Sequence, residues 1–113
     1  MITITIVRQS ASDRRIVSFA IEGHAKYAKP GKDIVCAGVS AVSVGTVNAI
    51  EELAGIELPA SMNNGWLHSE IPEHSDPSAN ERVQLLLESM IVMLNAIAAS
   101  YGNYVQIRQQ FRS

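Results

Sequence analysis

Cysteine is almost absent from this sequence. The 113-residue chain has a single one, Cys36, so no internal disulfide can form, and the usual spacings of zinc-binding cysteines and histidines do not occur. A lone thiol is typical of a reducing compartment. Basic charge is not in excess either, since nine Lys and Arg are balanced by eleven Asp and Glu, and only 5% of the residues are aromatic. This composition argues against direct binding to nucleic acid.

No segment predicts a signal peptide or a membrane anchor. The first residues, MITITIVRQS, lack the basic start, apolar block and small-residue cleavage site of a secretory signal. The charge-free stretch at residues 34–50 is short for a bilayer span and contains serine, threonine and asparagine. With 47% apolar and 18% charged residues, the chain is expected to fold as one globular domain, residues 1–113, in the cytoplasm and away from membranes.

Strands are predicted in two pairs. Alternating or β-branched apolar residues at 2–7 and 14–22 indicate the first pair. An Asn-Gly turn at 63–65 indicates a hairpin between strands at 56–62 and 66–71, and Pro59 places the first of these at a sheet edge. A last strand is expected at 103–108.

Helices are expected after each strand pair. The first begins near Asp33 as N-cap and ends at about Ala54, with an apolar face formed by Val35, Val39, Val42, Ile50 and Leu53. The second begins with a capping box at Ser78 and Glu81 and ends at about Tyr101. The order is therefore ββαββαβ, an α/β fold of the α+β type with one mixed or largely antiparallel sheet and two helices packed on it.

The single thiol lies at a position suited to reactivity. Three residues after Asp33, Cys36 falls in the first helical turn, where unpaired N–H groups and the helix dipole stabilise a thiolate or an oxyanion. Lysines at 26, 29 and 32 act in the same direction. Across the loop, His24 could accept the thiol proton and later protonate a leaving amine. From spacing alone, a lone cysteine is more often a small buried hydrophobe than a nucleophile, and an aspartate at this position is more often only a cap.

The other histidines do not indicate a metal site. His68 lies on a hairpin strand and His74 in a loop, and neither has a ligand partner at the usual spacing. We expect no metal and no cofactor.

The segments GHA at 23–25 and GKDIVCAGVSAVSVGTVNAI at 31–50 resemble the ribosomal-processing cysteine proteases of the Prp family. The resemblance includes the NNG hairpin and the long second helix, and so covers nearly the whole chain. It implies a catalytic dyad of Cys36 as nucleophile and His24 as general base and acid. Asp33 matches the family aspartate, as a helix cap or as a residue that orients His24.

The resemblance also implies a substrate site and a substrate. Gly23, Gly31 and Ser40 are candidate substrate-binding residues, with the glycines as hinges of a loop that closes over the substrate. Pro30 departs from the family pattern and is expected to stiffen that loop. The implied activity is a cytoplasmic, homodimeric endopeptidase that removes a short N-terminal extension, rich in aromatic and apolar residues, from large-subunit ribosomal protein twenty-seven during ribosome maturation.

Two other functions remain open at this stage. A dimeric, non-enzymatic module could hold a peptide of a ribosomal protein by edge-strand pairing, with Cys36 inert and buried. A thiol sensor could use Cys36 alone, but it would need a partner thiol from another molecule. Small residues on the first helix and the long apolar second helix are compatible with a dimer interface and equally with a monomeric core.

Overall fold

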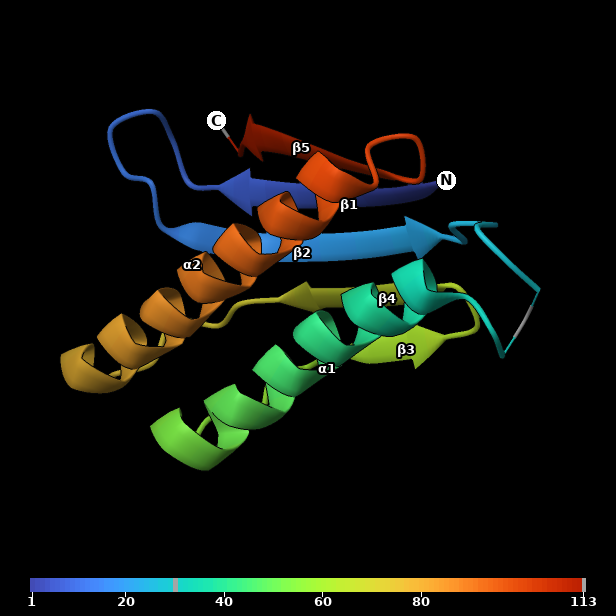
Figure 1. The fold of residues 1–113 in the computed structure, drawn as a ribbon. Coiled ribbons are helices and arrows are strands. Elements are labelled where there is room, and N and C mark those ends of the chain that lie inside the picture. The colour runs from blue at the N-terminus through green and yellow to red at the C-terminus, as the bar shows by residue number, and fades with distance from the viewer. Residues whose placement is uncertain (30, 113) are drawn as a thin grey trace.

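The computed structural model describes residues 1–29 and 31–112; the expected stiffening at Pro30 lies outside that range. The elements follow the predicted order ββαββαβ (Figure 1). They are β1 (Ile2–Arg8), β2 (Ile16–Gly23), α1 (Ile34–Ala54), β3 (Ser61–Asn63), β4 (Trp66–Glu70), α2 (Pro77–Ser100) and β5 (Val105–Phe111).

The strands form one mixed sheet in the order β3-β4-β2-β1-β5. Strands β1 and β5 are parallel, whereas the β1–β2, β2–β4 and β3–β4 pairs are antiparallel. Both helices cover the same face of this sheet (Figure 1). The alternation in β1 turns Ile2, Ile4 and Ile6 toward the helices, where all three are buried. The prediction of a single mixed sheet with two helices packed on it is confirmed.

The helices contribute the other half of the core. Val35, Val39 and Ile50 of α1 are buried as expected, but Leu53 is 62% exposed and the prediction for it was wrong. Ala54 is buried in its place, because the helix face turned to the sheet passes through Ala54 at that end. The α2 residues with the least exposed side chains are Val83, Leu87, Met90 and Leu94.

The start of α2 also differs from the prediction. Asp76, and not Ser78, is the N-cap: its carboxylate accepts the backbone N–H of Ser78 at 3.0 Å, and Pro77 follows as the first helical residue. The Ser78 hydroxyl instead accepts a hydrogen bond from Arg82 Nη1 at 2.7 Å. The predicted capping box of Ser78 with Glu81 is therefore wrong, because an aspartate N-cap followed by proline at the first helical position favours a helix start at Asp76.

The third strand is shorter than predicted. Only Ser61–Asn63 pairs with β4, at the sheet edge that Pro59 indicated. Ile56 and Leu58 are buried without joining the sheet, and Ala60 N donates to Leu58 O at 2.7 Å in a tight turn. The apolar residues there predicted a strand, but they fill the core from an irregular segment.

An ion pair between the nearly buried Arg8 and the half-exposed Glu88 joins the sheet to α2. A register shift between Val7 and Arg8 accompanies the inward placement of the Arg8 side chain, which is 6% exposed. Its guanidinium donates to both carboxylate oxygens of Glu88, at 2.9 and 2.7 Å, and to Gln109 Oε1 at 2.9 Å. The hydrogen bonds from Arg8 outweigh burial and lower the pKa of Glu88.

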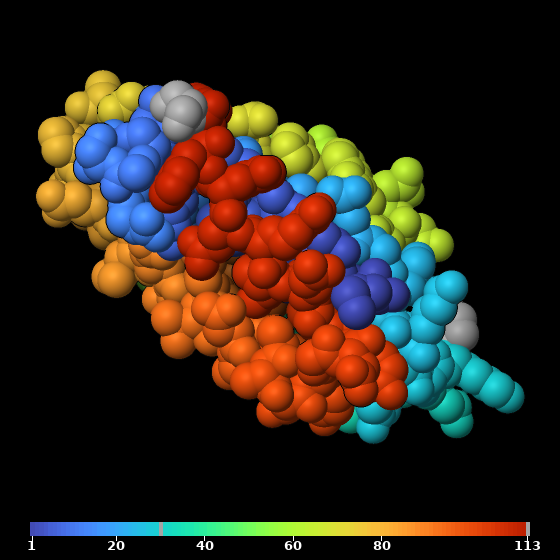
Figure 2. Space-filling model, turned by 90° about the horizontal axis from the view of Figure 1, so that it is seen from above, coloured from blue at the N-terminus to red at the C-terminus, as the bar shows by residue number. Residues whose placement is uncertain are grey.

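The outward sides of the helices are apolar. Leu85 and Val92 of α2 are 67% and 69% exposed, and a hollow of about 290 Å³ between the helices is lined by Gly45 and Met93, among others. By length and composition both helices could span a membrane, with mean hydropathies of 1.5 and 1.6. This is weak evidence, because core helices of soluble proteins share these properties. Viewed from above, the loop between β2 and α1 projects at one end of the molecule (Figure 2).

Candidate active site

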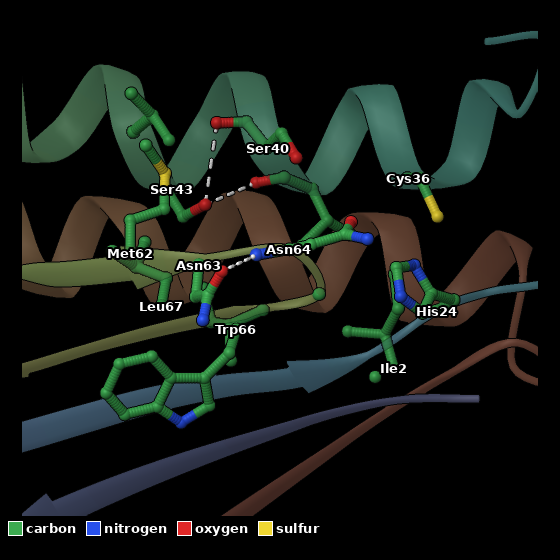
Figure 3. A pocket seen from close by; sticks show the side chains of 15 residues that line it. Ile2, His24, Cys36, Ser40, Ser43, Met62, Asn63, Asn64, Trp66 and Leu67 are labelled. Carbon is green, nitrogen blue, oxygen red and sulfur yellow. Dashed lines mark hydrogen bonds between the residues drawn. The ribbon is translucent and has the colours of Figure 1, made fainter. Parts of the chain in front are cut away.

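The sequence-predicted thiol and imidazole lie at the same end of the fold. β2 ends at Gly23, so His24 follows the sheet directly, and Cys36 lies in the first turn of α1. The backbone N–H of Ala25 donates to Cys36 Sγ at 3.3 Å, which joins the two segments. His24 and Cys36 line the same cavity, with the sulfur and the ring on one side of it (Figure 3). Cys36 packs against the core but is partly exposed and lines the cavity, so its sulfur is accessible there.

Asp33 organises the entry to α1. Its Oδ1 accepts the N–H groups of Val35 and Cys36, each at 3.0 Å, and so caps the helix. Its Oδ2 accepts those of Tyr27 at 2.9 Å and Ala28 at 3.3 Å. Desolvation alone would raise the pKa of this carboxyl, but the four N–H donors outweigh it and lower the pKa below the ordinary value. The hydrogen bonds of Asp33 within the described chain do not include His24.

This cap changes the expected role of the helix N-terminus. The N–H groups of Val35 and Cys36 point to the Asp33 carboxylate, so they are not free to bind a thiolate or an oxyanion. The donor that reaches the sulfur belongs to Ala25, in the segment that carries the histidine. The sequence predicted the helix position of the thiol, but the donation from Ala25 to the sulfur was not foreseen.

The first half of the loop is anchored at two positions, His24 and Tyr27. The His24 carbonyl accepts the Met1 amino group at 2.7 Å. The Tyr27 ring packs edge-on against Tyr101 and Tyr104, with centroids 5.7 and 5.1 Å apart. Gly31 has a φ of +83° and open space around it. A hinge motion at Gly31 stays a prediction.

Gly23 is held by its surroundings. With φ at +92°, it donates its N–H to Gly65 O at 2.8 Å, and a side chain there would overlap the carbonyl of Met1. Its backbone thus ties the end of β2 to the β3–β4 turn. The hinge role expected at Gly23 likewise remains a prediction.

The β3–β4 hairpin supplies residues that the sequence reading missed. Glu22 of β2 pairs with Trp66 of β4, which brings the turn at Asn64 and Gly65 beside His24. A Cβ atom on Gly65 would lie 2.5 Å from His24 Nε2, so the ring packs directly on the glycine backbone. The Asn-Gly turn was recognised as a hairpin, but its place beside β2 depends on strand order, which no local signal reveals.

Two cavities meet at the thiol. One, of about 240 Å³, is largely apolar, with Val39, Val44, Met62 and Leu67 in its lining. The other, of about 710 Å³, includes Lys26, Gly31 and Asp33. The residues common to both are His24, Cys36, Ser40 and Asn64. Together the cavities make a groove with the thiol between them. An extended peptide bound along this groove would have a central peptide bond at the sulfur.

The remaining histidines lie outside this groove. His68 stacks on Trp66 at 5.8 Å between centroids and lies 3.8 Å from Glu70, and His74 Nδ1 accepts the N–H of Asp76 at 3.0 Å. Among residues 1–29 and 31–112, no three His, Cys, Asp or Glu side chains gather as metal ligands would.

A partly exposed thiol and an imidazole line the same cavity, the combination that cysteine proteases use for nucleophilic attack. Comparison with known proteins specifies the kind. The family model described as cysteine protease Prp matches residues 1–106. A curated relative from Bacillus subtilis, the ribosomal processing cysteine protease Prp, is 44% identical over 95% of this chain and 96% of its own length. The chain belongs to the Prp family of cysteine proteases.

Solved structures show the same fold. The essential ribosomal processing protease Prp of Staphylococcus aureus, in complex with a covalently linked product peptide, superposes with a TM-score of 0.83 at 32% identity. The same protease in complex with a substrate peptide gives 0.77 at 31% identity. Each alignment covers 96% of this chain and 99% of the other.

Proposed function

We propose that this protein is a cytoplasmic endopeptidase that removes a short N-terminal extension from large-subunit ribosomal protein twenty-seven. The observation that carries the proposal is the groove that crosses Cys36 and His24. The names of the relatives support a ribosomal substrate, and the S. aureus protease has been seen with both a substrate peptide and a covalently linked product peptide.

In the proposed reaction, His24 accepts the thiol proton and Cys36 Sγ attacks the scissile carbonyl carbon. A C–S bond forms, and the carbonyl π electrons move onto the oxygen. When the C=O bond re-forms, the C–N bond breaks, and His24 gives its proton to the leaving amine. Water, deprotonated by His24, then attacks the thioester carbon. The C–S bond breaks as the acid product forms, and the protonated His24 returns its proton to the sulfur. The N–H of Ala25 holds the sulfur in place through these steps.

The groove matches a peptide substrate with an apolar residue next to the scissile bond. The cavity lined by Val39, Met62 and Leu67 accepts an apolar or aromatic side chain of the extension. Ser40, one helical turn beyond Cys36, lines both cavities and binds the peptide backbone near the thiol. Gly23 borders the apolar cavity and Gly31 the larger one, where their backbones face the peptide. Asp33 acts as a positioning residue that holds the first turn and the loop.

The proposed assembly is a homodimer. Its support is the exposed apolar surface on the outer sides of α1 and α2, including Leu85 and Val92.

The direct test is cleavage of the precursor's N-terminal peptide, followed by mass spectrometry. The native protein should cut the peptide at one bond. Cys36→Ala should abolish the cut, and His24→Ala should reduce it nearly as far, because members of a catalytic unit are not additive. Binding of the peptide without cleavage by the native protein would favour a peptide-binding module instead.

A further inference from the structure

Asn64 lies in the groove with Cys36 and His24, but the reaction as described so far gives it no role. It lines both cavities together with His24 and Cys36. Figure 3 shows its carboxamide directed toward the side of the cavity on which these two residues lie. Its own N–H donates to Asn63 Oδ1 at 2.8 Å, but within residues 1–29 and 31–112 its carboxamide has no hydrogen-bond partner.

The proposed reaction needs a donor for the carbonyl oxygen, and three N–H groups close to the thiol are already engaged. Attack by sulfur puts negative charge on the carbonyl oxygen, and a donor aimed at that oxygen is usually the largest source of stabilisation. The N–H groups of Val35 and Cys36 are engaged by Asp33. The N–H of Ala25 is engaged by the sulfur itself.

We infer that the side-chain amide of Asn64 is the oxyanion donor of this site, and so a third catalytic residue; this rests on the proposed peptidase function. Nδ2 donates to the oxygen as the C–S bond forms, and the hydrogen bond weakens when the C=O bond returns. No proton is transferred to or from Asn64.

The turn that carries Asn64 is fixed relative to the dyad. Gly65, the next residue, is in contact with the His24 ring and accepts the N–H of Gly23 at 2.8 Å. The hairpin thus fixes the backbone that carries Asn64 relative to the imidazole before substrate binds. Such preorganisation is what makes a donor effective in the transition state.

The test compares Asn64→Ala and Asn64→Asp with the native protein on the precursor peptide. Removing an oxyanion donor costs about 10²- to 10³-fold in kcat, so both variants should lose that much with KM little changed. Asn64→Asp keeps the shape but has no N–H to donate. Asn95→Ala, an exposed asparagine of α2 outside both cavities, serves as the matched control and should be unaffected.

Two further measurements separate this role from a structural one. Alkylation of Cys36 by iodoacetamide develops no oxyanion, so its rate should be unchanged in both Asn64 variants. A peptide aldehyde, which forms a tetrahedral adduct with the thiol, should bind more weakly by the same factor as kcat/KM falls. Binding of the cleaved product peptide should not change.

The outcomes are distinct. If the native protein cleaves and Asn64→Ala keeps the native kcat, with or without a raised KM, the inference is wrong while the proposed function stands. Slower alkylation in both variants would also overturn it, because the substitution would then act through the dyad. If the native protein does not cleave at all, the proposed function itself fails.

Discussion

Replacing Gly65 by alanine should move the proposed general base. The added Cβ would lie 2.5 Å from His24 Nε2 and 2.8 Å from Cε1, whereas ordinary van der Waals contact begins at 3.4 Å. The ring must therefore retreat by about 0.9 Å or rotate away. A misplacement of about 1 Å at a reacting group can cost on the order of 10²-fold in rate, so kcat/KM should fall by about that factor.

The substitution also has a cost that is unrelated to His24. Gly65 has a φ of +74°, and an L-residue in this region costs about 1–2 kcal/mol. Gly55, at the end of α1, is a matched control, because its φ is +71° and no atom lies within 4 Å of its added Cβ. Gly55→Ala should therefore lose comparable stability in urea unfolding while it keeps its peptidase activity.

The assay is cleavage of the precursor peptide at saturating and limiting concentrations, together with the NMR shifts of the His24 imidazole. Only Gly65→Ala should change both the cleavage rate and the NMR shifts of His24. Equal activity in the two glycine variants, or a loss of activity that follows stability in both, would refute the argument that the turn positions His24.

Three further predictions concern other contacts. Glu88→Gln should lower the free energy of unfolding by about 1–2 kcal/mol, because it leaves the nearly buried Arg8 without its charged partner; the half-exposed carboxylate limits the effect, and urea unfolding measures it. Because the pKa of Asp33 is lowered in the folded protein, its stabilisation of the loop is fully present above the unfolded-state pKa of about 3.9 and is lost as the pH falls through the folded-state pKa. The amide exchange of Tyr27, whose N–H Asp33 accepts, should therefore accelerate in acid. In Asp33→Asn this acid-dependent step should be absent. Ser40→Ala should raise KM several-fold with kcat nearly unchanged, as separate kcat and KM measurements on the peptide will show; an unchanged KM would exclude the proposed contact.

Local signals predicted the position of the thiol. An aspartate followed by an apolar run is sufficient to set the N-terminus of α1, so Cys36 was placed in the first turn from a few neighbouring residues. The alternation in β1 was equally local and predicted the strand. At the start of α2 two residues could each cap the helix, Asp76 and Ser78; the prediction of Ser78 was wrong, because Asp76 is the N-cap.

The rest of the site depends on contacts between distant segments. Nothing near Asn64 or Gly65 in sequence indicates that their turn packs on His24, because that contact follows from β4 pairing with β2. The use of the first-turn N–H groups by Asp33 could be foreseen as a cap, but not the donation from Ala25 to the sulfur. Loop geometry and strand order decide these contacts, and both are set by the whole core.

The parallel pairing of β1 with β5 has a consequence for biosynthesis. It joins Ile2 to Val105, so the interior strand β1 acquires its second neighbour only after a distant segment of the chain has been made. Such a non-local contact slows folding, and until it forms, one edge of β1 is an open template for wrong pairing. The β1–β2 hairpin can form early, whereas sheet closure is expected to be the late step, with protection of the β5 amides in pulsed hydrogen exchange as its marker. In this order the sheet around β1 is completed only after the segment that contains β5 has left the ribosome.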